Sequence, residues 1–239
     1  TDNECYMIPL FFNLLAIYYV QVFLIRNSYS RMLKAAISLV LACLFHQISI
    51  LVWLSVAGVL VFNRNKKYIL CFLAVSLAIP AVYVVSVYSL SGEVSVKSTI
   101  EFALTDYMNG TAQMPQVKQV LVLSFVSLIR TFVQVHGYMF DFVKDNLAIS
   151  IIVIAMVACF FVLGCIAFVK DKHRVLRLFH ERRFVRMLWV LLIFTFCFAA
   201  FSNGNAEFMT MIPFLVVMLH AYYFSCHKPL ILLGLSLLL

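Results

Sequence analysis

The polar residues that could do chemistry in this chain are few, and they gather at turns between long apolar stretches. The richest turn is Ser202-Asn203-Gly204-Asn205-Ala206-Glu207. A carboxylate such as Glu207 beside an amide such as Asn205 can bind sugar hydroxyls or a cationic group. The Asn/Gly cluster is equally typical of an ordinary turn, in which Glu207 complements the positive end of the next helix. Both interpretations stay open.

Three further residues could bind a phosphate group. His46 and Gln47 lie together inside the apolar run Leu33–Phe62, and Arg130 lies in a segment of mixed polarity. Imidazole and amide N–H groups donate hydrogen bonds to phosphate oxygens, and a guanidinium binds them in a bidentate way. Each has a structural alternative, with His46 as a helix cap or packing residue and Arg130 as a side chain that extends to the lipid headgroups.

The segment Lys170–Arg186 carries seven Lys and Arg, two histidines and several apolar residues. This pattern is typical of a basic juxtamembrane loop on the anionic cytoplasmic side of a membrane. His173 and His180 are seven residues apart with no third ligand near them, so no metal site is predicted. The predicted role of the segment Lys170–Arg186 is to fix the orientation of the chain in the membrane.

The composition decides which solvent must surround these elements. The chain is 64% hydrophobic and 12% charged, with a mean hydropathy of +1.03. A soluble domain is nearer half apolar and a quarter charged, so the surrounding solvent must be lipid. The net charge of +8 therefore predicts topology rather than nucleic-acid binding. We expect an all-α, polytopic transmembrane bundle that forms one domain over residues 1–239.

The apolar runs predict seven membrane spans and the start of an eighth. The run Leu33–Phe62 is too long for one crossing of a core about 30 Å thick, and His46 and Gln47 at its middle predict a break into two helices. The apolar runs are Ile8–Ile25, Leu33–Phe62, Tyr68–Tyr88, Val120–Phe140, Leu147–Val169, Met187–Ser202, Phe208–Phe224 and Leu230–Leu239.

Residues 120–140 predict an amphipathic helix. Ser124, Ser127, Thr131 and Gln134 recur every three or four residues, which places them on one helical face. Such a helix could lie in the membrane interface, re-enter the membrane, or span it beside a polar cavity. We favour the interface, within a larger outer-face segment that covers residues 89–146.

The distribution of charge decides the topology. With a break at His46 and no crossing by 120–140, one side of the membrane receives 14 of the 18 Lys and Arg and only the acids Asp171 and Glu181. The other side receives the remaining acids, which are Asp2, Glu4, Glu93, Glu101, Asp106, Asp141, Asp145 and Glu207. This is the positive-inside pattern, with segment 170–186 as the cytoplasmic basic loop. In the rival topology, residues 33–62 form a single long helix and the helix over residues 120–140 crosses the membrane.

Three stretches resemble membrane glycosyltransferases of the GT-C fold, which use polyprenyl phosphate as the lipid carrier. These include the family 39 enzymes and the mannosyltransferase-like and aminoarabinosyltransferase-like enzymes. The stretches are Thr1-Asp2 before an apolar helix, Leu41-Ala42-Cys43-Leu44-Phe45-His46-Gln47, and Gly204-Asn205-Ala206-Glu207-Phe208 before Met211-Ile212-Pro213-Phe214-Leu215. The resemblance implies that a sugar is transferred from a lipid carrier at the outer face of the membrane. Glu207 and Asn205 would then lie near the sugar, and His46, Gln47 and Arg130 near the phosphate. Asp2 would lie at the outer mouth of the site. The resemblance also implies a catalytic base upstream of Thr1, so that the chain is a fragment and its catalytic residue is unknown.

We therefore expect an integral membrane enzyme, in a bacterial inner membrane rather than the endoplasmic reticulum. It needs no cofactor or metal in this segment, and its donor is a lipid-linked polyprenyl-phosphate sugar. Expected partners are membrane lipids and other chains of a membrane complex, not nucleic acid. A polysaccharide polymerase or ligase is disfavoured because segment 89–146 holds one Arg and one His. A polytopic transporter or flippase, or a non-catalytic membrane subunit, is the alternative.

Overall fold

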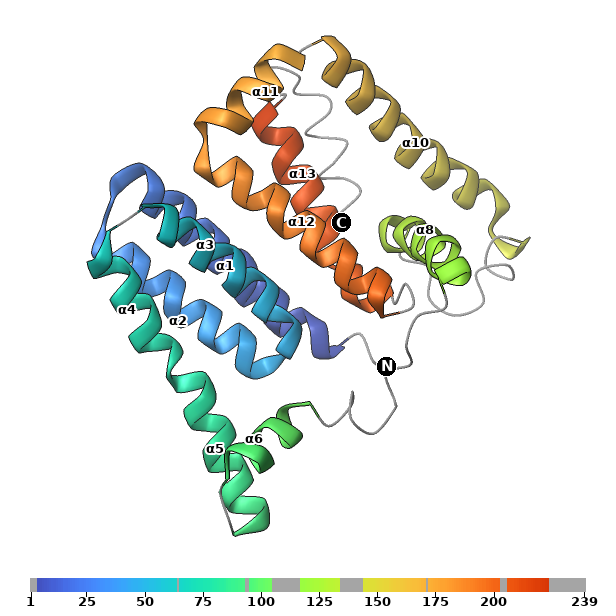
Figure 1. Ribbon diagram of the computed structural model, residues 1–239. Coiled ribbons are helices and arrows are strands. Elements are labelled where there is room, and N and C mark those ends of the chain that lie inside the picture. The colour runs from blue at the N-terminus through green and yellow to red at the C-terminus, as the bar shows by residue number, and fades with distance from the viewer. Residues whose placement is uncertain are drawn as a thin grey trace. The chain divides into compact units, whose positions relative to one another are not determined.

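The computed structural model describes residues 4–63, 65–92, 95–104, 117–133, 144–170, 172–202 and 206–223. The chain divides into two compact units, unit 1 (Thr1–Met114) and unit 2 (Pro115–Leu239). Figure 1 shows that every element drawn is a helix, as the composition predicts.

Among the residues that the structure describes, four helices are long and apolar enough to cross a membrane. They cover Tyr6–Arg26, Lys66–Ser91, Leu147–Lys170 and Arg183–Phe201, and two shorter apolar helices cover Gln47–Phe62 and Ile212–Tyr223. The predicted class, a helical integral membrane protein, agrees with these helices.

Unit 1 begins with a helical hairpin. Helix α1 (Glu4–Arg26) packs along α2 (Tyr29–Phe45), and this is the most extensive helix pair in the described chain. Asn27 makes the turn between them with a φ of 50°, a left-handed conformation that asparagine tolerates better than most residues. Its backbone N–H donates to the carbonyl of Phe23, which closes the end of α1.

The predicted break inside residues 33–62 is present in unit 1. Helix α2 ends at Phe45, a 3-10 turn η1 follows at Gln47–Ser49, and α3 (Ile50–Asn63) begins at once. His46 is extended at this point, with φ −156° and ψ 127°. The backbone therefore leaves the helix at the polar pair, and the chain turns back on itself (Figure 1).

The predicted span 68–88 is one rod made of two helices, α4 (Lys66–Ser76) and α5 (Ala78–Ser91). The interruption has a local cause in Pro80, whose missing N–H cannot bind the carbonyl of Ser76. The helical pattern continues past it, since the N–H of Ala81 donates to the carbonyl of Leu77 at 3.1 Å. The two helices therefore form one continuous apolar segment, Lys66–Ser91.

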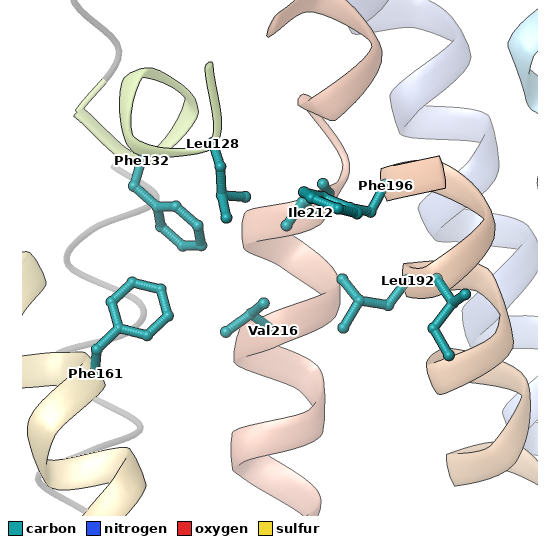
Figure 2. Close-up of a pocket in the computed structure, with 8 residues that line it drawn as sticks. Leu128, Phe132, Phe161, Leu192, Phe196, Ile212 and Val216 are labelled. Carbon is teal, nitrogen blue, oxygen red and sulfur yellow. The ribbon is translucent and has the colours of Figure 1, made fainter. Parts of the chain in front are cut away.

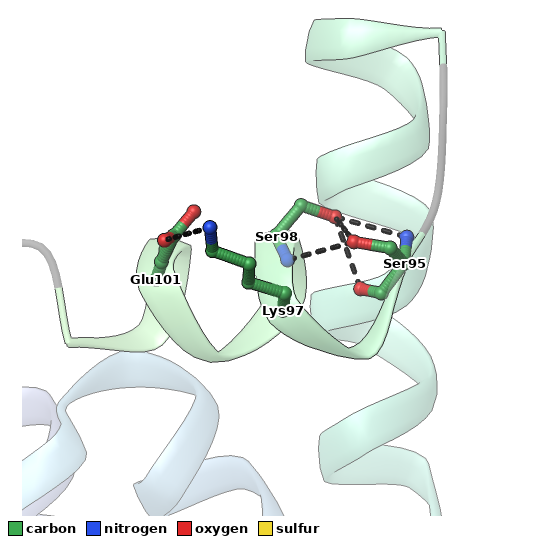
Figure 3. A network of polar contacts seen from close by, with 4 residues as sticks. All are labelled: Ser95, Lys97, Ser98 and Glu101. Carbon is green, nitrogen blue, oxygen red and sulfur yellow. Dashed lines mark hydrogen bonds and ion pairs between the residues drawn. The ribbon is translucent and has the colours of Figure 1, made fainter.

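The predicted outer segment contains a short helix, α6 (Val96–Ala103), that packs against α5. Ser95 and Ser98 form a reciprocal capping box at its start, and Lys97 lies 3.8 Å from Glu101 one turn later (Figure 3). These local bonds explain how eight residues can hold a helix without burying any of them.

Unit 2 is built around α12. Its elements are α8 (Val117–Val133), α10 (Leu147–Lys170), α11 (Lys172–Glu181), α12 (Arg183–Phe201), the 3-10 turn η2 (Ala206–Met209) and α13 (Ile212–Tyr223). A core of Phe132, Ala199, Met209 and Ile212 joins α8, α12, η2 and α13. Trp189 of α12 also donates from Nε1 to the Tyr223 hydroxyl at 2.7 Å, which fixes α13 alongside.

The amphipathic helix is present as α8, but its polar face is turned inward. Ser124 and Thr131 are buried, and Thr131 donates to the carbonyl of Ser127 at 2.7 Å. The exposed side is apolar, with Val122, Phe125 and Ile129 each more than half exposed. In lipid this arrangement is favourable, because the hydroxyls face protein and the apolar side faces the membrane. The predicted residues 134–140 lie outside the described residues.

Candidate functional site

The turn between α2 and α3 gathers polar groups at one end of unit 1. We call Tyr6, Asn13, His46, Gln47 and Ser49 the turn site. The first two residues come from α1, and the others from the turn itself. The tyrosine ring of Tyr6 lies against the imidazole of His46, with ring centroids 4.6 Å apart. Two predicted residues, His46 and Gln47, therefore sit beside groups from a different helix.

His46 acts as the cap of η1. Its Nδ1 accepts a hydrogen bond from the Ile48 N–H at 3.2 Å, as the structural interpretation of this residue predicted. Because Nδ1 accepts, a neutral imidazole carries its proton on Nε2. The side chain is half-buried. The ring is thus held in one tautomer, and its Nε2–H is a donor of the kind that a phosphate oxygen accepts.

Asn13 is a site residue that the sequence analysis missed. It is only 5% exposed, and its Nδ2 donates to the Ser49 hydroxyl at 3.0 Å, which ties α1 to the turn. Its Oδ1 is buried and has no hydrogen-bond partner among the described residues. The signal in the sequence was an amide within the apolar run Ile8–Ile25, since polar residues inside a membrane segment mark functional sites.

Gln47 connects the turn site to the outer segment. Its Nε2 donates to the carbonyl of Ala103 at the end of α6, at 3.1 Å. The turn at His46 and the start of segment 89–146 therefore meet at the same end of unit 1. The charge distribution predicted that these two parts of the chain share one side of the membrane.

The opposite end of unit 1 is basic. There the Tyr68 hydroxyl donates to the carbonyl of Asn27 at 2.8 Å, which joins the α1–α2 turn to the start of α4. The cations at this end are Arg26, Arg31, Lys34, Lys66 and Lys67. The 17 residues of α2 separate the two ends by about 25 Å, close to the thickness of a bilayer core.

Two predicted residues of unit 2 lie on elements that contact each other. Glu207 is in η2, a separate turn before α13 rather than the first turn of that helix, and Arg130 is in α8. η2 packs against α8, and Met209 joins Phe132 in the core. The side chains of Glu207 and Arg130 are outside the described part of the chain, as are Asp2 and Asn205 altogether.

An apolar pocket of about 270 Å³ lies beside this core, between α8, α10, α12 and α13. Figure 2 shows Phe132 and Phe161 on one side of it, with Leu192 and Val216 facing them. All its lining residues are hydrocarbon side chains: Leu128, Phe132, Phe161, Leu192, Ile193, Phe196, Ile212 and Val216. The volume is near the lower limit of about 300 Å³ typical of ligand sites, and the lining suits a hydrocarbon chain.

The arrangement brings no three His, Cys, Asp or Glu side chains together among the residues that the structure describes. What it offers is hydrogen bonding at the turn site and apolar contact in the pocket. Comparison with protein-family models, curated proteins and solved structures found no match for this chain.

Proposed function

We propose that this chain belongs to a membrane glycosyltransferase that moves a sugar from a polyprenyl-phosphate carrier to an acceptor at the outer face. In this proposal it crosses a bacterial inner membrane seven times and begins an eighth span. The segment 89–146 then lies on the outer face, and the basic loop 170–186 lies in the cytoplasm.

The observation that carries the proposal is the polarity of unit 1. The turn site, with its imidazole and amides, is at one end of the helices. Five of the six Lys and Arg residues that the structure describes in unit 1 are at the other end, and the sixth, Lys97 on α6, is paired with Glu101. A lipid-linked sugar presents its phosphate at the membrane surface, where N–H donors are needed. Polar groups at the outer end of a bundle suit that task, because the inner end is identified by its lysines and arginines.

The pocket of unit 2 supports the same proposal from the lipid side. A polyprenyl carrier has a long hydrocarbon tail, and part of that tail fits a cavity lined by leucine, isoleucine, valine and phenylalanine. The pocket shares Phe132 and Ile212 with the core that holds η2, the turn that contains Glu207. In this proposal Glu207 and Asn205 of unit 2 bind the sugar and Arg130 of the same unit binds a phosphate group. His46 and Gln47 of unit 1 donate hydrogen bonds to a lipid phosphate, and Asp2 lies at the outer mouth.

Glu207→Gln is expected to lower sugar transfer about tenfold. The amide keeps hydrogen bonding but loses the charge, and a charge-assisted bond exceeds a neutral one by roughly 1.4 kcal/mol. The measurement is transfer of radiolabelled sugar from a polyprenyl-phosphate donor by the full protein in lipid vesicles. Glu181→Gln, at the end of α11, is the matched control and should leave the rate unchanged. Equal rates for both variants would contradict the role of Glu207.

Val216→Phe is expected to weaken binding of polyprenyl phosphate several-fold. The added ring occupies space in the pocket that the hydrocarbon chain would fill (Figure 2). Binding is measured by native mass spectrometry on the purified protein with a polyprenyl phosphate of defined length. Val190→Phe, at an exposed position of α12, adds the same volume outside the pocket and should bind as the parent does.

The two alternative functions give different results in these measurements. A non-catalytic subunit would bind the carrier without any transfer that depends on Glu207. A flippase would move the carrier between leaflets with its sugar still attached. Either result would replace the transferase assignment, and the pocket would remain a lipid-chain site.

A further inference from the structure

Helix α11 is a short connector between two helices that can cross the membrane. It follows α10 and precedes α12, both of which are long and apolar enough to span. Helix α11 packs against α12 and α13 of unit 2, and its Val175 is buried at 5% exposure. A helix between two spans, anchored in this way, lies at the membrane surface.

The outer side of α11 combines apolar and cationic residues. Leu176 is 63% exposed and Phe179 is 43% exposed, so neither contributes to the core of unit 2. Leu176 lies one helical turn from both Lys172 and His180, which are exposed as well. Apolar side chains beside a cationic stripe are the pattern of helices that lie in the membrane interface.

The cations continue from α11 into the first turn of α12. We give the name basic corner to six of the exposed basic residues here; they are Lys172, His173, Arg177, His180, Arg182 and Arg186. The segment 170–186 has only Asp171 and Glu181 as acids, so it cannot neutralise its own charge. On α6, in contrast, Lys97 is matched by Glu101 (Figure 3). The negatively charged phosphate groups of the surrounding lipids can neutralise the positive charge of the basic corner.

We propose that the basic corner binds anionic phospholipids, with Leu176 and Phe179 inserted among the upper parts of the acyl chains. Arg177, Arg182 and Arg186 then hold the headgroup phosphates, for which guanidinium groups are well suited. This site is separate from the turn site and from the apolar pocket, and it does not depend on the proposed glycosyltransferase activity. It keeps a local layer of anionic lipid around the α10–α12 connection.

Trp189 provides a local probe for the test. It lies in α12, seven residues after Arg182, a rise of about 10 Å. The only other tryptophan is Trp53, so Trp53→Phe leaves Trp189 as the single tryptophan of the sequence. The protein is reconstituted in mixed phosphatidylcholine and phosphatidylglycerol vesicles, with bromine on the acyl chains of one lipid or the other at equal mole fractions.

Quenching of Trp189 by brominated phosphatidylglycerol should exceed quenching by brominated phosphatidylcholine at least twofold. Arg177→Gln combined with Arg182→Gln should bring the ratio close to one, and so should a high salt concentration. Lys66→Gln with Lys67→Gln removes two exposed cations from unit 1 and should leave the ratio unchanged. An unchanged Trp189 emission spectrum in pure phosphatidylcholine shows that the variants fold.

Equal quenching by the two lipids in the parent protein would overturn the proposal. A ratio that survives loss of both arginines would also overturn it, because the preference would then have another source. If the arginine variant does not fold, native mass spectrometry of the parent protein decides the question. The site is supported if the protein retains more phosphatidylglycerol than phosphatidylcholine and loses this excess in high salt. Equal retention of the two lipids contradicts the site.

Discussion

Replacing Gly164 with alanine lowers the stability of unit 2 by about 1–3 kcal/mol, the usual cost of forcing extra volume into a packed interior. A Cβ atom at this position of α10 would lie 2.5 Å from Nε2 of His220 on α13. The imidazole cannot simply rotate away, because its Nδ1 is 2.9 Å from the carbonyl oxygen of Val216. Its ring also lies tilted against that of Phe160, with 4.5 Å between the ring centroids. The loss appears as a melting temperature lower by several degrees in detergent.

The control for this experiment is Gly58→Ala in α3, where an added Cβ meets nothing within 4 Å. That variant should be neutral or more stable by up to about 1 kcal/mol, because alanine favours a helix more than glycine does. His220→Ala combined with Gly164→Ala should lose less than the two single losses together, since the clash is then absent. Additive losses would mean that the two helices do not approach at Gly164.

Gly164 also shows what sequence reasoning could not supply. The sequence shows a glycine in an apolar run, and such a residue fits a close helix contact or a lipid-facing surface equally well. Its partner is 56 residues away on another helix, and no local pattern names it. The pairing depends on how α10 and α13 cross, which tertiary packing decides.

The break at His46 was predictable for a different reason. Thirty apolar residues exceed one crossing, and a polar pair at mid-membrane is costly, so local physics alone requires a turn there. The bond from Gln47 to Ala103 was not predictable, because it joins residues 56 positions apart. The position of the turn follows from the local sequence, and its partners follow from the fold.

The amphipathic helix α8 shows the limit of periodicity. The spacing of Ser124 and Thr131 identified residues that share a face, which the structure confirms. It did not identify what that face meets. In water a polar face is exposed, whereas in lipid the exposed face is the apolar one, and the hydroxyls turn toward protein. Burial of Ser124 at 1% exposure is the outcome expected for a helix that is solvated by hydrocarbon.

Replacing Ala16 with leucine lowers the stability of unit 1 by about 3 kcal/mol, at the upper end of the range for overpacking. Ala16 is fully buried on α1, and α2 presents the equally buried Ala35, Ala36 and Ala42. Lipid tails are as apolar as leucine, so close approach of small residues holds membrane helices together more than hydrophobicity does. Three extra carbon atoms at Ala16 therefore separate the hairpin instead of strengthening it. The measurement is thermal unfolding in detergent micelles.

Ala74→Leu adds the same atoms at an exposed position of α4 and should change stability by less than about 0.5 kcal/mol. The turn site adds a second readout, because separation of α1 from α2 also pulls Asn13 away from Ser49. Ala16→Leu should then increase amide hydrogen exchange at η1, whereas Ala74→Leu should not. Equal stability of the two variants would show that α1 and α2 do not pack through their small residues, and the turn site would lose the helix pair that positions it.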